Sequence, residues 1–272
     1  MEALNRAKRR FPDLKAAVIV TDLPNEMGLS TGRKGLMKRI EAKMGNKSLS
    51  LLQTMDGFIL LTSHMADALQ VQNKPYEVIE GLILSKQDIQ LDAPSTNRPV
   101  FLYTGTLEAE LGISEMLSAF EEMPEYDLWI CGHGTMKNEV EEYASRCYNI
   151  QFYGFVPQKK ALTMQASATA LLNPRQPNGL FTKYSFPSKT LEYMRSGKPV
   201  LCCKLEGIPA EYDSYLCYMD KGKTGIIQAV RKLMDLSPEK RNALGSAAQN
   251  YVLQHKNPKV QCKKLLSLLR RM

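Results

Sequence analysis

The chain has 272 residues, of which 44% are hydrophobic and 24% are charged, a composition that favours a globular protein of two ordinary domains. No apolar run approaches the roughly 20 residues of a membrane span, and the charged first residues exclude a secretion signal, so we expect a cytoplasmic protein. The net charge of +8 attracts polyanions in general, but no aromatic residues interleave with a basic stripe, so we expect no nucleic-acid partner.

The six cysteines show neither the spacing of zinc ligands nor that of a disulfide framework. Most stand among apolar residues, which predicts buried, reduced thiols in a cytoplasmic protein. They are Cys131, Cys147, Cys202, Cys203, Cys217 and Cys262.

The first part of the chain indicates a small α/β unit with few helices to cover its strands. Ala16–Thr21 and Gly57–Leu61 are expected strands, and Val78–Ile79 is a third, shorter one. Between the second and third, the segment SHMADAL is an expected helix capped by Ser63. The composition of Asp92–Pro99 is that of a linker.

From Arg98 onward, short apolar runs alternate with amphipathic stretches, the pattern of a doubly wound α/β domain. The expected strands are Val100–Thr104, Leu128–Cys131, Ile150–Tyr153, Ala168–Asn173, Pro199–Cys203 and Leu216–Met219. The expected helices are Ile113–Glu122, Met136–Arg146, Lys159–Gln165, Lys189–Arg195 and Gly225–Met234.

Two helices, near Pro238–Gln254 and Pro258–Met272, are expected to end the chain. The last has leucines on one face and basic residues elsewhere, so it either lies on a membrane or packs back on the protein, and we expect the second. We divide the chain into a partial N-terminal Rossmann-like domain (1–97), a second Rossmann-like domain (98–254) and a C-terminal amphipathic helix (255–272).

The most informative stretch contains NPR and then FTKYSFPSKTLEY. It places Arg175, Lys183 and Lys189 beside a helix that starts at Pro187-Ser188, and a helix N-terminus carries unpaired amides and partial positive charge that suit phosphate. Glu192 lies one turn into this helix, and its negative charge cannot help to bind phosphate, so we expect it to accept hydrogen bonds from a sugar hydroxyl. Together these residues predict a site for a nucleotide diphosphate.

Five motifs occur in order at domain-scale spacing: YTGTL, WICGHG, QFYGFVP, NPR and FPSKTLEYMRSGKPVL. With these motifs the chain resembles retaining glycosyltransferases of family 4, particularly bacterial capsular and exopolysaccharide enzymes. The resemblance implies two Rossmann-like domains facing a cleft, the N-terminal one incomplete here. It also implies that the C-terminal domain, 98–254, holds the donor, a UDP-sugar or GDP-sugar, and that no further cofactor is needed.

By position, the resemblance places Phe155 and Val156 at the donor base and Gly105 where the first loop approaches the diphosphate. Glu192 matches the second glutamate of the family's Glu-x7-Glu motif, which bonds the ribose hydroxyls. The first glutamate of that motif falls on Tyr184, a departure from the family.

A second departure concerns the cations that usually follow the first strand and hold the diphosphate. Their positions are occupied by Thr106 and Leu111. We therefore assign neutralisation of the diphosphate, the catalytic role, to Arg175 and Lys189, with Lys183 as a helper.

Further donor contacts are expected at Thr106, Ser188 and Thr190. His133, between two glycines after a strand, is either a ligand contact or a plain turn residue. His64 falls near an expected helix start and is expected to be a surface or capping residue. No residues have metal-ligand spacing, in agreement with a family whose transfer needs no tightly bound metal.

A run of basic residues precedes the second expected strand, with apolar residues spaced for one helical face. Such a helix either meets an anionic membrane or a polyprenyl-linked acceptor, or is a solvated charged face. Its basic residues are Arg33, Lys34, Lys38, Arg39, Lys43 and Lys47. Asp22 is either an acceptor-side residue or a turn residue.

The leading hypothesis is a glycosyltransferase, peripheral on the inner face of the membrane, that transfers a sugar to a surface glycan with retention. The rival is a nucleotide-sugar-binding protein that needs a second chain to complete its first domain. A nucleotide-sugar epimerase shares the two-domain plan, but the acid and base residues that it needs in the cleft have no counterpart in the sequence.

Overall fold

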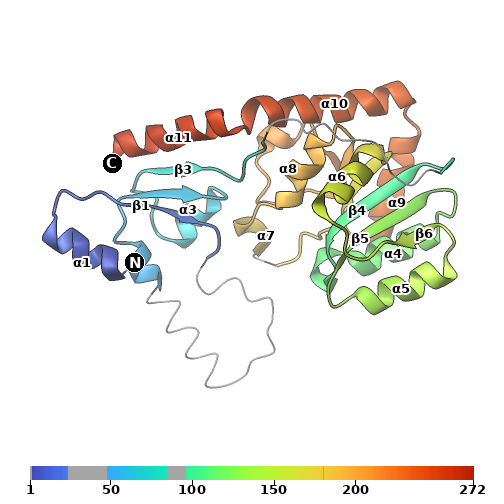
Figure 1. Cartoon of the computed structure of the whole chain (residues 1–272), viewed down its shortest axis with the longest axis horizontal. Coiled ribbons are helices and arrows are strands. Elements are labelled where there is room, and N and C mark those ends of the chain that lie inside the picture. Colours follow the sequence, from blue (N-terminus) through green and yellow to red (C-terminus); the bar gives the residue numbers. More distant parts are fainter. Residues whose placement is uncertain (1, 24–47, 85–95, 180) are drawn as a thin grey trace, which may run out of the picture.

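The computed structural model describes residues 2–23, 48–84, 96–179 and 181–272, which form two parallel β-sheets with helices around them (Figure 1). The larger sheet has the strand order β6-β5-β4-β7-β8-β9. Its strands are β4 (Val100–Thr106), β5 (Asp127–His133), β6 (Ile150–Phe152), β7 (Ala170–Asn173), β8 (Val200–Cys203) and β9 (Cys217–Met219). This order reverses between β4 and β7, which makes the sheet doubly wound.

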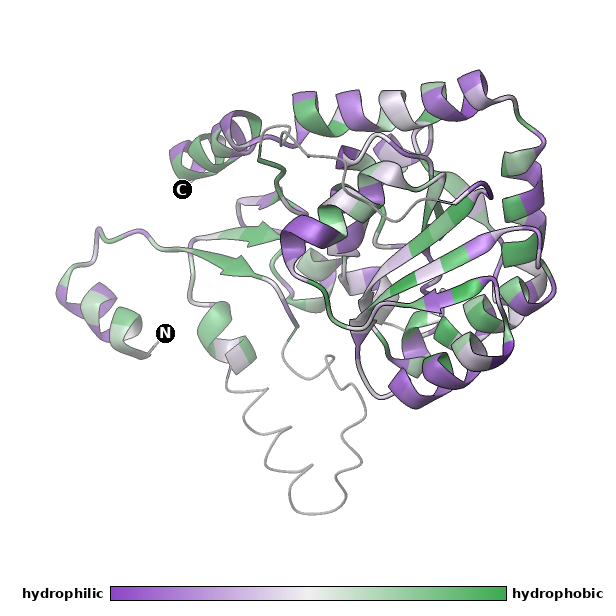
Figure 2. Cartoon of the chain, turned by 45° about the vertical axis from the view of Figure 1, so that its right-hand side comes forward, coloured by the Kyte–Doolittle hydropathy of each residue, from purple (hydrophilic) through white to green (hydrophobic). Residues whose placement is uncertain are grey.

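Helices cover the larger sheet on both faces, so its strands are apolar on both sides (Figure 2). The helices of one face contact one another: α4 (Ile113–Glu121), α5 (Lys137–Arg146) and α9 (Gly222–Met234). Those of the other are α6 (Gln158–Ser167) on β4 and α8 (Ser188–Arg195) on β7 and β8, backed by α10 (Pro238–His255). Short helices lie in the loops: η1 (Ala109–Leu111), α7 (Phe181–Tyr184) and η2 (Ala210–Tyr212).

The smaller sheet has the order β1-β2-β3 and its own apolar core. Its strands are β1 (Ala17–Val20), β2 (Gly57–Leu60) and β3 (Tyr76–Val78), with α1 (Glu2–Arg10) and α3 (His64–Ala68) beside them. Lys8 of α1 forms an ion pair of 2.7 Å with Asp56, which directly precedes β2.

The last helix, α11 (Pro258–Arg271), crosses from the larger sheet to the smaller one and contacts β2 and β3 (Figure 1). Asn257 caps it, because its side-chain oxygen accepts a hydrogen bond of 3.0 Å from the amide of Val260. Leu268 is fully buried on its inner face, and Lys264 donates to the carbonyl of Val78 at 3.0 Å. The C-terminal helix α11 therefore packs on the smaller sheet.

Lys256, at the junction of α10 and α11, lies in a buried charged cluster where the two sheets meet. Its ammonium bonds the carboxylates of Glu80, just after β3, and Glu211 in η2. The Lys256 and Glu80 side chains are 2% and 1% exposed. The hydroxyl of Tyr212 also donates to Glu80, so one buried carboxylate joins both parts of the chain.

The predicted α/β class with Rossmann-like domains is confirmed. Every expected strand is present with shifts of one or two residues at its ends. The predicted cap of α3 is wrong: Ser63 has helical backbone angles, and its side chain makes no capping hydrogen bond. Helices α1 and α7 were not expected, and the basic run at 33–47 lies outside the described residues. No described helix combines the length and hydropathy of a membrane span.

Candidate functional site

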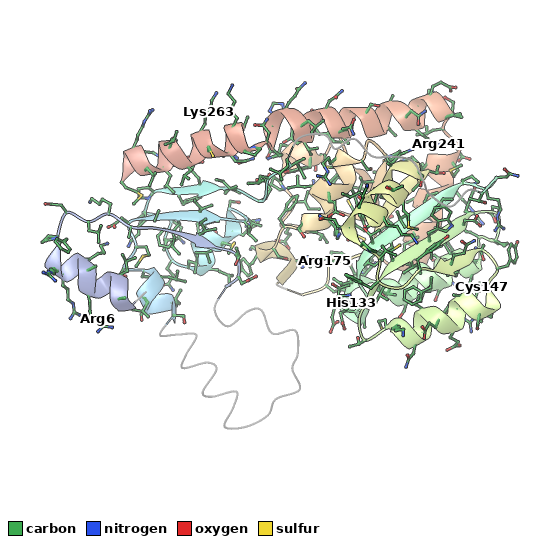
Figure 3. All side chains as sticks on the ribbon, viewed as in Figure 1. Arg6, His133, Cys147, Arg175, Arg241 and Lys263 are labelled. Carbon is green, nitrogen blue, oxygen red and sulfur yellow. The ribbon has the colours of Figure 1, made fainter. Side chains whose placement is uncertain are left out.

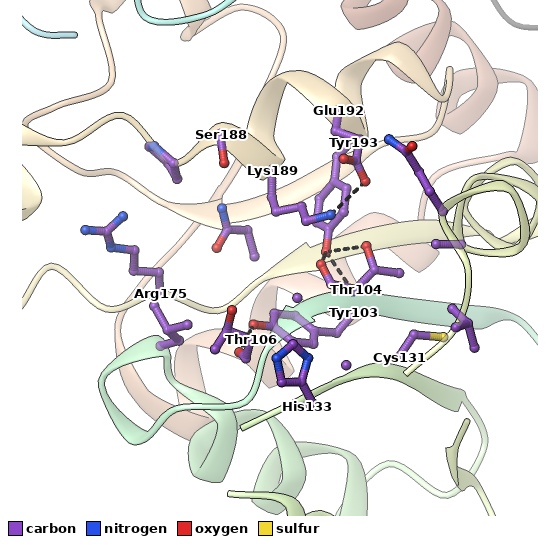
Figure 4. Close-up of a pocket in the computed structure, with 18 of the residues that line it drawn as sticks. Tyr103, Thr104, Thr106, Cys131, His133, Arg175, Ser188, Lys189, Glu192 and Tyr193 are labelled. Carbon is purple, nitrogen blue, oxygen red and sulfur yellow. Dashed lines mark hydrogen bonds and ion pairs between the residues drawn. The ribbon is translucent and has the colours of Figure 1, made fainter. Parts of the chain in front are cut away.

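A pocket of about 510 Å³ lies at the carboxyl ends of β4, β5 and β7 (Figure 4). In doubly wound sheets, the loops that leave the two central strands diverge at the point where the strand order reverses, and this opens a crevice. Here that point lies between β4 and β7. Gly105 and Thr106 reach the crevice from β4, and Asn173 and Arg175 reach it from β7.

Close backbone approach fixes the floor of the pocket. A side chain at Gly132 would place its Cβ 1.9 Å from the carbonyl oxygen of Gly105, so only glycine allows the ends of β4 and β5 to meet. The hydroxyl of Tyr193 accepts from the amide of Thr104 at 2.8 Å and donates to its carbonyl at 3.0 Å. Helix α8 is thereby fixed to the end of β4.

The N-terminus of α8 points into this pocket (Figure 4). The first amides of a helix have no acceptor within the helix, and its dipole adds partial positive charge. Ser188 is exposed and lines the pocket with Lys189. Thr190 is buried instead. Its hydroxyl accepts a hydrogen bond of 3.4 Å from the side-chain amide of Asn173, and its backbone amide donates to the carbonyl of Pro187. The Thr190 side chain therefore does not line the pocket.

Glu192 lies one turn along α8 and lines the same pocket with its side chain 23% exposed. One of its carboxylate oxygens accepts from the Lys189 ammonium at 2.9 Å and from the Gln165 side-chain amide at 2.6 Å. Gln165 is fully buried and also bonds the Thr104 hydroxyl at 2.9 Å. Lys189 and Glu192 thus form an ion pair in this structure.

Arg175 lines the pocket opposite the start of α8, in the turn after β7. Its guanidinium donates to the hydroxyl of Ser185 at 2.7 Å, which holds it toward the loop before α8. Burial lowers the pKa of Arg175, although the group stays charged at any physiological pH. Lys183 is not among the lining residues, and its carbonyl accepts a hydrogen bond of 3.1 Å from the hydroxyl of Thr62, in the loop after β2.

The opposite rim of the pocket is aromatic. His133, the last residue of β5, packs edge-on against Phe155 with 5.6 Å between ring centroids. Phe155 is 76% exposed, and Val156 beside it also lines the pocket. An exposed ring at the mouth of a pocket is a surface on which a planar base can stack.

The other candidates add no reactive group to this pocket. Burial raises the pKa of Cys131, which lines it, to about 12, so its thiol stays protonated. His64 lines a separate pocket between the two sheets, and Asp22 is exposed and bonds Thr21. Tyr184 packs against the core of the smaller sheet. Within the described ranges, no cluster of three His, Cys, Asp or Glu residues is arranged to hold a metal ion.

Gln165 and Tyr193 were missed by the analysis of the sequence, although both shape the pocket. Tyr193 matches the apolar face of α8, so its pattern is that of an ordinary core residue. Gln165 is buried at the end of α6 together with Leu162, Thr163 and Met164. A glutamine on the buried face of a helix needs a polar partner, and its position in the sequence could therefore have indicated a buried hydrogen bond near the pocket.

The strand order and the pocket at its reversal define a class: doubly wound α/β proteins with two Rossmann-like units. Residues 86–251 match the family model described as glycosyl transferases group 1. This match spans more than half of the chain, so the protein belongs to that family, and the predicted glycosyltransferase class is confirmed at that level. A search of curated proteins gives no match.

Solved structures share this fold at low sequence identity. Sucrose-phosphate synthase from Thermosynechococcus elongatus has a TM-score of 0.70 and 14% identity, over 98% of this chain and 70% of that one. HepE from Anabaena, solved with UDP-glucose, has a TM-score of 0.65 and 14% identity, with 98% and 76% covered.

TarM from S. aureus, solved with UDP, fondaparinux and α-GlcNAc-glycerol, has a TM-score of 0.64 and 14% identity. The alignment covers 93% of this chain, which spans 50% of the length of TarM. At such identities the likeness establishes the fold alone.

Proposed function

We propose that this protein transfers a sugar from a nucleoside-diphosphate sugar, a UDP-sugar or a GDP-sugar, to a hydroxyl of a surface glycan. The observation that carries the proposal is the convergence of Arg175, Lys189 and the open start of α8 on one pocket that also contains Glu192. Cations and free amides suit the diphosphate, and a carboxylate suits the ribose hydroxyls. Gly105 and Thr106 close the pocket floor, and Phe155, Val156 and His133 form the rim for the base.

In this proposal the protein stabilises the leaving diphosphate and forms no covalent bond with the sugar. The bond between the anomeric carbon and the diphosphate breaks while the acceptor oxygen bonds that carbon, and the acceptor proton passes to the departing phosphate oxygen. Negative charge grows on the diphosphate, where Arg175, Lys189 and the α8 amides lie. The acceptor oxygen bonds the anomeric carbon on the face that the diphosphate leaves, so the configuration at that carbon is retained.

The Lys189–Glu192 ion pair adds a step to donor binding. In the structure, Lys189 is 40% exposed and bonds Glu192 at 2.9 Å. A diphosphate draws the flexible ammonium toward itself, and the ribose hydroxyls then replace it at the carboxylate. Gln165 keeps Glu192 in place during this exchange, because the hydrogen bond of 2.6 Å from its side-chain amide to the Glu192 carboxylate does not depend on Lys189.

The function is tested by incubating the protein with a panel of UDP- and GDP-sugars and measuring released nucleotide. Slow release with one donor, accelerated by a glycan acceptor, is the expected result. Binding of UDP or GDP without release under any condition would favour the rival, a nucleotide-sugar-binding protein that acts with a second chain. Absence of both binding and release would reject the assignment of the pocket.

Substitution of Glu192 by glutamine should weaken UDP binding about tenfold, because the neutral amide loses charge-assisted bonds to the ribose hydroxyls. Calorimetric titration with UDP and with its 2′,3′-dideoxy analogue separates a contact with the ribose hydroxyls from an effect of the Glu192 charge on the diphosphate. The dideoxy analogue should bind both proteins equally. An equal loss for both ligands would show that Glu192 does not contact the ribose.

For the acceptor side, we propose peripheral contact with an anionic membrane or a polyprenyl-linked glycan through the basic residues at 33–47. Glutamine at Lys34, Lys38, Arg39 and Lys43 should lower sedimentation with anionic vesicles, since each cation near such a surface favours binding. Unchanged sedimentation of this variant would leave the run as a solvated charged face.

A further inference from the structure

The C-terminal end of this chain is strongly basic. The whole chain has 36 lysines and arginines and 28 aspartates and glutamates. Residues 240–272 contain eight of these basic residues and no acidic one, so the remaining 28 cations and 28 anions of the chain balance. The net charge of residues 240–272 therefore equals the excess of +8, and these residues form most of α10, the junction at Lys256 and α11, along one long edge of the molecule (Figure 1).

Part of this charge has an internal partner. Four of the eight cations bond to groups of the protein itself: Arg241, Lys256, Lys264 and Arg271. Lys259, Lys263 and Arg270 are exposed on α11, and none of them has an acidic partner within the part of the chain that the structure describes. Like charges gathered on one helix without counter-ions repel one another, which favours an anionic partner.

The same side of α11 carries an apolar stripe. Cys262, Leu266 and Leu269 follow one another at intervals of four and three residues, the spacing of one helical face. Leu266 and Leu269 are 52% and 48% exposed, while Leu268 on the inner face is fully buried against the smaller sheet. The outer face of a helix that is already packed thus presents leucines beside free cations.

From this face we infer a second contact of the protein: α11 lies on an anionic lipid bilayer. A basic helix with an apolar stripe lies in the interface, leucines toward the acyl chains and cations at the lipid phosphates. Nucleic acid would match the charge but offers nothing for the leucines. Lys263 stands on the edge of the molecule away from Arg175 and His133 (Figure 3), so contact through α11 leaves the pocket uncovered.

The test is cosedimentation of the full chain with phosphatidylcholine vesicles, with and without phosphatidylglycerol. Wild type should bind the anionic vesicles and only weakly the neutral ones. Each cation near an anionic surface is worth about fivefold in affinity, so glutamine at Lys259, Lys263 and Arg270 should lower binding on the order of 100-fold. Glutamine at Leu266 and Leu269 should lower it about tenfold or more at unchanged charge.

A matched control replaces the same number of exposed cations elsewhere, with glutamine at Lys221, Arg231 and Lys232 in and before α9. This control should keep its vesicle binding, and every variant should keep the UDP affinity of wild type. Equal binding by the control and the α11 cation variant, or no binding of wild type to anionic vesicles, would overturn the inference. So would self-association that is lost with Leu266 and Leu269 in the absence of lipid binding, since α11 would then join two copies.

The inference does not rest on sugar transfer, because vesicle binding needs no donor. Failure of the nucleotide panel would leave it standing, and failure of the vesicle experiment would leave the proposed transferase standing. The variant at 33–47 keeps α11 intact, so a combination of the two sets of substitutions separates the two membrane contacts.

Discussion

Replacement of Arg175 and Lys189 together by alanine should weaken UDP binding on the order of 1,000-fold, as measured by calorimetric titration. Each charged donor to a phosphate oxygen contributes about 1.5–3 kcal/mol, and no other lysine or arginine lines the pocket within the described residues. The loss of Lys189 also removes the ion pair of Glu192, whose negative charge then opposes the diphosphate.

A matched double variant, with alanine at Arg195 and Lys232, removes the same charge away from the pocket. Arg195 is in the last turn of α8 and Lys232 in the last turn of α9. This control should bind UDP as wild type does. If both double variants bind UDP alike, or if the pocket variant retains more than a tenth of the wild-type affinity, these two cations do not hold the diphosphate.

Substitution of Lys256 by methionine should lower the free energy of unfolding by about 3–5 kcal/mol in urea titrations. The methionine fits the space of the lysine stem, but it leaves the carboxylate of Glu80 charged and buried, with Tyr212 as its one remaining donor among the described residues. A buried charge without a counter-ion costs much more than the pair contributes. Glu211 suffers less, because its side chain is 49% exposed to water.

The double variant with methionine at Lys256 and glutamine at Glu80 distinguishes a lost charge balance from lost packing. Removal of both charges should return at least half of the stability that the single variant loses. A single variant that loses less than 1 kcal/mol would show that the Lys256 cluster does not hold the two sheets together. A double variant as unstable as the single one would point to packing instead.

The strands of the larger sheet could be predicted because each is a short apolar run bounded by polar turns, a pattern that two covered faces require. The site was predicted from the cations beside the start of α8 and from the order of the motifs, and parallel pairing brings the motifs after β4, β5 and β7 to one edge of the sheet. Thr190 shows where this logic stops. Its place in the motif suggested a ligand contact, but its position on α8 turns it inward to Asn173.

The sequence by itself determined the alternation of strands and helices, the motif order and the gathering of cations around a helix start, because periodicity and turn chemistry are local. Tertiary structure decided which side chains meet across distance. Gln165 of α6 bonds Glu192 of α8, and Lys256 pairs with Glu80, which is 176 residues away in the sequence. Helix α11 packs on β2 and β3. Such pairs depend on how whole elements pack, and no local pattern encodes the distance between two buried charges.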